Sequence, residues 1–348
     1  MVSAGTLYGI KKAFNIPSSE SLKPSSGSEK VSLSQGKSKR DLMMQVLDMS
    51  SKPVYIPAGF FMHFGVTGDA AVKAHLDYFR ASGMDFVKIQ FDEESLPKND
   101  QIKTPGDWAK MPVLPEKWFE PAIYLLKNLI KEAKKDALII QTLYSPYQMA
   151  KQAVPWNLIV DHVKEDAESV CRGMENITLS IMNFVSAASR AGVDGFYMCS
   201  QGGETNRISD LTHFYRVIKN YDMILYKEAC QLVPFNMLHL CDYDGSYENF
   251  TLRFQDYPGQ VINVPLSADN KPLALSQAAD IFKRPVMGGL DRHGIIATGS
   301  PEDVKKATIE VLKNAPANVI LGADCTIDRK TPIENIRAAI DTAHKFRS

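Results

Sequence analysis

Long apolar segments and a surplus of charge of either sign are missing from this sequence of 348 residues. No run reaches the roughly 18 apolar residues that a membrane-spanning helix needs, and residues 1–21 lack the continuous apolar core of a secretory signal. Lysine plus arginine and aspartate plus glutamate both total 40, so the net charge is zero. The basic surface typical of nucleic-acid-binding proteins is therefore not expected. We predict a cytoplasmic protein with neither a membrane nor nucleic acid as partner.

Cysteine is sparse, and its pattern argues against disulfide bonds. The five cysteines are an odd number and are widely scattered, at positions 171, 199, 230, 241 and 325. A large intracellular chain keeps such thiols for packing, metal binding or catalysis. Cys171, Cys199 and Cys230 fall within helix or strand patterns and are predicted to be core residues. Cys241 and Cys325 are the candidates for chemistry.

Apolar residues are also scarce between positions 17 and 39, where the sequence reads PSSESLKPSSGSEKVSLSQGKSK. A segment of this composition cannot bury enough apolar surface to offset the entropy lost on ordering. Residues 1–39 are therefore predicted to be a flexible leader. Residues 40–348, which begin with an amphipathic stretch over 40–49, are predicted to form one folded domain.

The rest of the chain alternates between apolar, β-rich runs and helical patterns. The predicted strands cover residues 54–64, 85–91, 137–143, 195–199, 236–241, 260–264, 285–290 and 318–322. The predicted helices cover residues 69–82, 115–134, 156–190, 208–231, 246–257, 273–282, 301–314 and 332–346. Ser300-Pro301 and Thr331-Pro332 are typical helix starts, with a capping residue ahead of proline. Eight strands, each followed by a helix, predict an α/β protein built as a single (β/α)8 TIM barrel.

The alternative architecture is an open, doubly wound sheet. Such a sheet normally carries a glycine-rich phosphate-binding turn after its first strand. The segment Gly65-Val66-Thr67-Gly68 is only a weak match to that turn, because it has no third glycine. The closed barrel is therefore the favoured architecture.

In a barrel of this type, function resides where the strands end and the βα loops begin. Those positions are rich in groups that bind metals or move protons. The predicted substrate contacts at these positions are His63, Asp92, Tyr144, Gln201, Asn263 and Asp291. Packing or exposed-loop roles are open alternatives for each of them.

The most specific pattern is His239-Leu240-Cys241, at the end of the fifth predicted strand. Because side chains alternate along a strand, His239 and Cys241 point to the same face. Cys325 follows the eighth predicted strand and can reach the same cavity across the barrel mouth. One histidine and two cysteines make a three-ligand zinc site with an open fourth position, as in catalytic zinc sites. The alternative is a hydrogen-bonded core histidine beside two small apolar cysteines.

Several longer motifs follow one another along the chain. They are MLHLCD at 237–242, PVMGGLDRHGIIATGSPEDV at 285–304 and ILGADCTIDRKTPIENIRAAI at 320–340. PVYIPAGFFMHFG at 53–65 and DGFYMCSQGGETNRIS at 194–209 fit the same pattern. This ordered set resembles the uroporphyrinogen decarboxylase superfamily. The resemblance runs from about residue 40 to the C-terminus and implies the same (β/α)8 barrel.

The superfamily contains two chemistries. One is cofactor-free decarboxylation of uroporphyrinogen, and the other is zinc-dependent methyl transfer between a corrinoid protein and a small thiol, as in the methylcobamide:coenzyme M methyltransferases. Those methyltransferases bind zinc through a His-x-Cys pair and a later cysteine ahead of a T-P-x-E-N-I-like helix start. The resemblance places His239, Cys241 and Cys325 at these positions, as zinc ligands and catalytic residues. It implies Zn2+ and a corrinoid (cobalamin) on a partner protein as the cofactors.

The features of the decarboxylases are weaker. Their arginine-bearing segment after the first strand corresponds to residues 58–63, which contain no arginine, and their histidine after strand eight corresponds to Ala323. Arg207 and Arg292 are the candidates for carboxylate binding, while Asp92 matches the acidic residue that contacts pyrrole nitrogens. A zinc-dependent corrinoid methyltransferase is therefore expected, with a uroporphyrinogen decarboxylase or a non-catalytic tetrapyrrole- or corrinoid-binding barrel as alternatives. The methyl donor, the thiol acceptor and the oligomeric state, a homo-oligomer included, are left open.

Overall fold

The computed structural model describes residues 37–50, 56–90, 96–243 and 245–346. Residues 1–36 of the predicted leader lie outside the described residues, as does Asp92. The first described helix is α2 (Lys39–Gln45), which overlaps the amphipathic stretch predicted over 40–49. Ser38 closes its N-terminus, because its hydroxyl accepts from the Asp41 amide at 3.2 Å.

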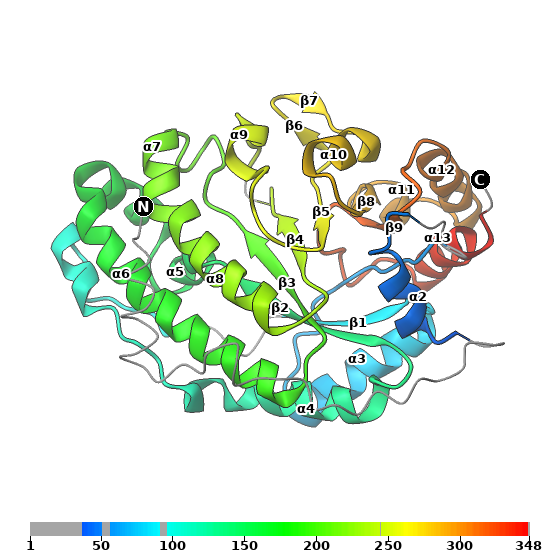
Figure 1. Cartoon of the computed structure of the whole chain (residues 1–348), viewed down its shortest axis with the longest axis horizontal. Helices are drawn as coiled ribbons and strands as arrows, with labels where there is room; N and C mark the ends of the chain where they lie inside the picture. The colour runs from blue at the N-terminus through cyan, green and yellow to red at the C-terminus, as the bar shows by residue number, and fades with distance from the viewer. Residues whose placement is uncertain (1–36, 51–55, 91–95, 244, 347–348) are drawn as a thin grey trace.

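Seven strands form one parallel sheet that curls around the centre of the molecule (Figure 1). In pairing order they are β1 (Phe86–Ile89), β2 (Leu138–Tyr144), β3 (Gly195–Ser200), β4 (Met237–Leu240), β5 (Val261–Asn263), β8 (Val286–Leu290) and β9 (Val319–Ala323). Every neighbouring pair is parallel. The strands follow chain order around the sheet, whereas a doubly wound sheet reverses its order at a switch point. The fold is therefore the predicted TIM-barrel-like one.

The eighth position of the barrel is taken by an irregular segment instead of the strand predicted over 54–64. The single bridge of this segment, among its described residues, joins Ala58 to Leu321 of β9. The amide of Asp85, just ahead of β1, donates to the Ala58 carbonyl at 3.0 Å. The segment thus closes the ring between β9 and β1. Pro57, beside the bridge, has no N–H with which to lengthen the ladder, so a regular strand does not form here and that prediction is wrong for the described residues.

Helices pack around the outside of the sheet and follow most of the predicted pattern. Those that overlap predicted helices include α3 (Gly68–Ser82), α4 (Glu120–Ala133), α6 (Trp156–Ala191), α8 (Asn220–Leu232), α10 (Leu275–Phe282), α12 (Pro301–Lys313) and α13 (Ile333–Lys345). Figure 1 shows α6 and α8 to the left of the strands and α12 and α13 to the right. Within the described ranges, none of the helices combines the length and apolar character needed to cross a membrane.

Several elements differ from the sequence-based prediction. The helix predicted over 208–231 is divided into α7 (Leu211–His213), a π-helical segment (Phe214–Lys219) and α8. The helix predicted over 246–257 shrinks to α9 (Phe250–Phe254). The helix predicted over 115–134 begins as a 3-10 turn (Glu116–Phe119) that leads into α4. Elements that the sequence did not predict are α5 (Pro146–Ala153), α11 (Ile295–Thr298), the hairpin of β6 (Ser267–Ala268) and β7 (Lys271–Pro272), and a 3-10 turn (Pro105–Lys110). These pieces span too few turns or residues to produce a periodic signal.

The two predicted helix starts have different outcomes. Ser300 caps α12, because its hydroxyl accepts from the Asp303 amide and the Asp303 carboxylate accepts from the Ser300 amide. Helix α13 instead begins at Ile333, with Pro332 as its N-cap and no side-chain hydrogen bond at the cap. The cap predicted at Thr331 is therefore wrong. That residue lies one position too early to reach the free amides of the first turn.

Two buried aspartates tie the strand starts together at the N-terminal end of the barrel. The carboxylate of Asp85 accepts from the Ala58 amide at 2.7 Å, and that of Asp194, ahead of β3, accepts from the Ile139 amide at 2.9 Å. Arg40 of α2 lies 2.7 Å from the Asp194 carboxylate. Buried carboxylates require such partners, because an unpaired charge is costly away from water. This end of the barrel is thus held by polar contacts, and the opposite end carries the cavity.

Candidate metal centre at the mouth of the barrel

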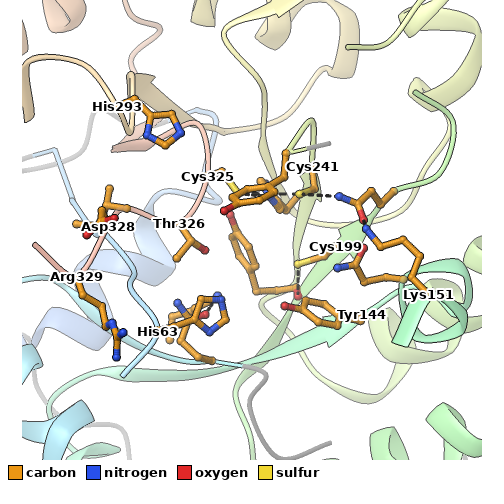
Figure 2. Close-up of a pocket in the computed structure, with 18 of the residues that line it drawn as sticks. His63, Tyr144, Lys151, Cys199, Cys241, His293, Cys325, Thr326, Asp328 and Arg329 are labelled. Atoms are coloured by element: carbon orange, nitrogen blue, oxygen red, sulfur yellow. Dashed lines mark hydrogen bonds between the residues drawn. The ribbon is translucent and has the colours of Figure 1, made fainter. Parts of the chain in front are cut away.

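A cavity of about 590 Å³ opens at the C-terminal ends of the strands (Figure 2). Its lining residues are His63, Lys88, Gln90, Tyr144, Gln148, Lys151, Tyr197, Cys199, Gln201, His239, Cys241, Tyr243, His293, Cys325, Thr326, Ile327, Asp328, Arg329 and Lys330. Most of them lie at or just beyond the ends of the strands. A volume of this size is typical of pockets that bind small molecules.

Strand β4 presents His239 and Cys241 to this cavity. Both residues line it, whereas Leu240 between them is fully buried on the other side of the strand. This is the alternation expected of a β-strand. His239 pairs in register with Cys199 of β3 and with Asn263 of β5. The backbone that carries the His-x-Cys pair is therefore held by a neighbouring strand on each side.

Cys325 reaches this pair from the loop that follows β9. Its Sγ lies 4.0 Å from the Sγ of Cys241 and 3.5 Å from the Nε2 of His239. One donor atom from each of the three residues lies within 4.8 Å of the other two, and all three residues are buried. Figure 2 shows Cys325 and Cys241 facing each other in the middle of the lining residues.

These separations suit a tetrahedral zinc ion. With zinc–sulfur bonds of about 2.3 Å and zinc–nitrogen bonds of about 2.0 Å, tetrahedral angles place two sulfurs about 3.8 Å apart and a sulfur and a nitrogen about 3.5 Å apart. The corresponding distances here are 4.0 Å and 3.5 Å. The donor set therefore fits zinc, and three protein ligands leave the fourth position open for a substrate.

Cys241 and Cys325 share a hydrogen bond that shifts the pKa values of the two thiols in opposite directions. This hydrogen bond to Cys241, together with the nearby His239 ring, holds the pKa of Cys325 well below its usual range. The same hydrogen bond, with burial, raises the pKa of Cys241 well above its usual range. One thiolate therefore forms readily, and a bound divalent cation would balance the charge of a second thiolate.

The ring of His239 is held by stacking. It lies against the ring of Tyr197, with centroids 5.0 Å apart and planes inclined by 24°. The Tyr197 hydroxyl donates to the Asn263 side-chain oxygen at 2.6 Å, and the Asn263 amide donates to the carbonyls of Met287 and Ala323 at 3.1 Å each. Among the described residues, the Nδ1 of His239 is buried without a hydrogen-bond partner. The stack therefore orients the ring while Nε2 faces the cysteines.

Gln201 contacts the cluster directly. Its amide nitrogen Nε2 lies 3.5 Å from the Sγ of Cys241, and its Oε1 accepts from the Nζ of Lys151 at 2.5 Å. The hydroxyl of Tyr247 donates to the carbonyl of Cys241 at 2.8 Å. Both the backbone and the sulfur of Cys241 are thus held in place by side chains.

The predicted substrate contacts divide into three groups. Those that line the cavity are His63, Tyr144 and Gln201. Asn263 and Asp291 do not belong to the described lining. Asn263 donates its amide to two backbone carbonyls, and Asp291 accepts from the His293 amide at 2.8 Å, so a substrate contact by either residue stays a prediction. Asp92 lies outside the described residues, and its role stays a prediction.

Several lining residues escaped the sequence-based prediction. Lys88 is a buried charge within the apolar strand β1, and that unusual position was the available signal. Cys199, predicted as a core residue, is buried but also lines the cavity, and burial raises its pKa to about 12, so it stays a thiol. Tyr197 lies two residues before Cys199 on β3 and therefore points to the same face, as His239 and Cys241 do. The other two predicted core cysteines, Cys171 and Cys230, pack against the core.

The two arginines considered for carboxylate binding are engaged elsewhere. Arg292 is paired with the carboxylate of Asp324 and lies 3.5 Å from that of Asp242. The guanidinium of Arg207 lies over the ring of Trp156, 4.1 Å from its centroid. Neither arginine is part of the described cavity lining.

Comparison with known proteins identifies the family. The uroporphyrinogen decarboxylase (URO-D) family matches residues 76–346, which is most of the chain. The chain therefore belongs to the URO-D family, as its motifs indicate. No curated protein matches it.

Two solved structures illustrate the shared fold. A methyltransferase from Methanosarcina mazei has a TM-score of 0.71 and 14% sequence identity, with 88% of this chain and 98% of that chain covered. A protein from Listeria monocytogenes, assigned as a vitamin-B12 independent methionine synthase, has a TM-score of 0.50 and 12% identity, with 83% and 95% covered. At such identities the likeness establishes the fold, and the choice of reaction depends on the site.

Proposed function

We propose that the protein is a zinc-dependent methyltransferase that moves a methyl group between a corrinoid, carried by a partner protein, and a small thiol. The observation that carries this proposal is the buried cluster of His239, Cys241 and Cys325, whose donor separations suit tetrahedral zinc with one open position. Membership of the URO-D family and the fold shared with the M. mazei methyltransferase are consistent with it.

Each residue of the cluster has a distinct part. Cys241 and Cys325, as thiolates, contribute two negative charges that balance a divalent cation, and His239 contributes a neutral nitrogen. Zinc, when bound, supplies a position at which a substrate thiol loses its proton near neutral pH. The three residues are no more than 9% exposed, so the position that they share lies deep in the cavity. A thiolate in such a site is less solvated and reacts more readily.

The cavity suits a small anionic substrate. Its cationic lining residues are Lys88, Lys151, Arg329 and Lys330. Asp328 is the one carboxylate among the lining residues that the structure describes. A thiol with a negatively charged tail can place its sulfur at the cluster and its tail among the cations.

The same cations favour a second candidate, the decarboxylation of a carboxylated tetrapyrrole, for which the family is named. That reaction requires no metal in the superfamily, so it does not explain the cluster of His239, Cys241 and Cys325. Residues 58–63 also lack the arginines with which the decarboxylases grip carboxylates. Methyl transfer to or from a thiol is therefore the better-supported function.

Side-by-side assays test the two reactions. We expect slow demethylation of free methylcobalamin in the presence of a small thiol, followed anaerobically by cobalamin absorbance, and no useful conversion of uroporphyrinogen to coproporphyrinogen. The variant Cys241→Ala serves as control and should abolish the first reaction. Robust coproporphyrinogen formation would instead establish the decarboxylase. Failure of both assays with zinc-loaded protein would reject methyl transfer to these thiols.

A further inference from the structure

The sulfur of Cys241 receives a hydrogen bond whose direction is decided by a lysine. The carboxamide of Gln201 lies between the two, with Nε2 at 3.5 Å from the Cys241 Sγ and Oε1 at 2.5 Å from the Lys151 Nζ. The oxygen and nitrogen of a glutamine amide can be exchanged by rotation of the side chain, so the hydrogen-bond network must settle their assignment. Lysine has donors and no acceptor. The atom beside Lys151 is therefore the oxygen, and the N–H faces the sulfur.

The surroundings make this contact stronger than a surface hydrogen bond. Gln201 is 2% exposed, so water competes little for its amide. A cation at the carbonyl oxygen polarises the amide and strengthens its N–H as a donor, and the low dielectric of a buried site enhances the effect. Hydrogen bonds to metal-bound sulfur withdraw electron density from it and tune the metal.

Three successive strand ends bring these residues together. Lys151 lies on α5, which follows β2 and is capped by Ser145, whose hydroxyl accepts from the Gln148 amide at 3.1 Å. Gln201 follows β3 directly, and Cys241 follows β4 directly. Because β2, β3 and β4 are neighbours in the sheet, the three side chains meet at one side of the cavity. Figure 2 draws Lys151 on the Cys241 side, away from His63 and Arg329.

We propose that Lys151, acting through Gln201, is a positioning residue that lowers the electron density on the sulfur of Cys241 and makes Cys241 the weaker donor of the two thiolates. The proposal rests on the metal site of the proposed function and adds a role for two residues around it. Gln201 then serves the metal ligand and is not a contact for the substrate. A weaker Cys241 donor leaves the metal more electron-poor, which strengthens the binding of a substrate thiolate at the open position.

Cobalt(II) in place of zinc provides a readout that is independent of turnover. The sulfur-to-cobalt charge-transfer band in the near ultraviolet moves to lower energy when a thiolate becomes more electron-rich. We expect Lys151→Met and Gln201→Leu to shift this band to lower energy and to weaken the binding of a small thiol to the metal-loaded protein, because Cys241 becomes the stronger donor in both variants. Lys151→Arg, which keeps a cation, should restore the wild-type band. Gln148→Leu is the matched control: Gln148 lines the same cavity, and within the described chain no hydrogen bond joins it to Cys241.

The outcomes separate this inference from the proposed function. If wild-type protein binds cobalt and zinc, and folded Lys151→Met and Gln201→Leu keep the wild-type band and the wild-type affinity for the thiol, the tuning role is wrong while the metal site stands. If wild-type protein binds neither ion, the metal site fails and the tuning role fails with it. Circular dichroism checks the fold of each variant, and the milder changes Lys151→Gln and Gln201→Asn replace any variant that does not fold.

Discussion

The ring of Tyr197 stacks on the ring of His239, with centroids 5.0 Å apart and planes inclined by 24°. Metal-binding histidines usually have their second ring nitrogen fixed by a carboxylate or carbonyl. Among the described residues, the Nδ1 of His239 has no such partner. The orientation of this ligand therefore depends on an aromatic contact, which is itself anchored by the hydrogen bond from Tyr197 to Asn263.

Removing this stack should weaken metal binding in a graded way. An aromatic pair contributes about 0.5–1.5 kcal/mol beyond its buried area, which corresponds to roughly two- to tenfold in a dissociation constant. We expect Tyr197→Leu to weaken zinc binding by about this factor. Tyr197→Phe keeps the ring and loses the hydroxyl, so its effect should be smaller. Competition with a chromophoric chelator measures both, and equal affinities for wild type and Tyr197→Leu would show that the stack has no orienting role.

The two cysteines of the cluster should be required for zinc and dispensable for the fold. We expect about one zinc per chain in wild-type protein, and none in Cys241→Ala or Cys325→Ala, because each variant leaves two ligands for the ion. The control is Cys230→Ala, since Cys230 packs against the core away from the cavity and should leave the zinc content unchanged. Elemental analysis measures the metal, and thermal unfolding of the metal-free proteins should show cooperative transitions for all. If wild-type protein takes up no zinc during dialysis against zinc, the proposed reaction loses its basis.

A buried carboxyl group behind the sheet should make stability fall with rising pH. Asp222 on α8 is fully buried, and it accepts from the hydroxyls of Ser200 at 2.6 Å and Tyr257 at 3.2 Å. Burial raises its pKa from 3.8 to about 8. The folded protein therefore keeps a proton that the unfolded chain has lost, and the contribution is full below pH 3.8 and lost as the pH rises to about 8.

The pH dependence of the free energy of unfolding tests the protonation of Asp222. In the window between these pH values, the free energy of unfolding should fall by up to about 1.4 kcal/mol per pH unit because of Asp222. Asp222→Asn cannot ionise, so its urea-unfolding free energy should vary less between pH 5 and 8 than that of wild type. Asp161→Asn, on an exposed position of α6, is the control and should keep the wild-type slope. Parallel curves for wild type and Asp222→Asn would mean that this carboxyl group is ionised in the fold.

The start of β3 should tolerate no side chain at Gly195. A Cβ at this position would lie 1.5 Å from the carbonyl oxygen of Phe235, a backbone atom that cannot move without shifting β4. Overpacking of this kind costs about 1–3 kcal/mol and occasionally more, so Gly195→Ala should lower the free energy of unfolding by at least about 2 kcal/mol. Gly106→Ala is the matched control, since its Cβ would meet the Thr104 side chain only at 3.9 Å. Equal urea midpoints for the two variants would contradict the packing argument.

Local periodicity was sufficient to predict most of the architecture. Helix α6 spans Trp156–Ala191 against a predicted 156–190, and β3 and β4 lie at or within one residue of their predicted limits, because long amphipathic and short apolar patterns reflect burial directly. The strand predicted over 54–64 was different. Ala58, Phe60 and Phe61 of its described part are buried, as the pattern suggests, but the pairing of that segment depends on partners that lie far along the chain.

The alternation of side chains along one strand also placed His239 and Cys241 on the same face, since that relationship is local. Only the closure of the barrel brought Cys325, which is 84 positions away in the chain, to within 4.0 Å of Cys241. Position at the end of a strand predicted Gln201 and Asn263 equally well as site residues. Only the structure shows that Gln201 contacts Cys241, whereas Asn263 donates to backbone carbonyls. Lys151 gave no signal at all, because its helix is short and its partner follows a different strand. Donor types and local faces follow from the order of residues, whereas distances between loops follow from the packing of the closed sheet.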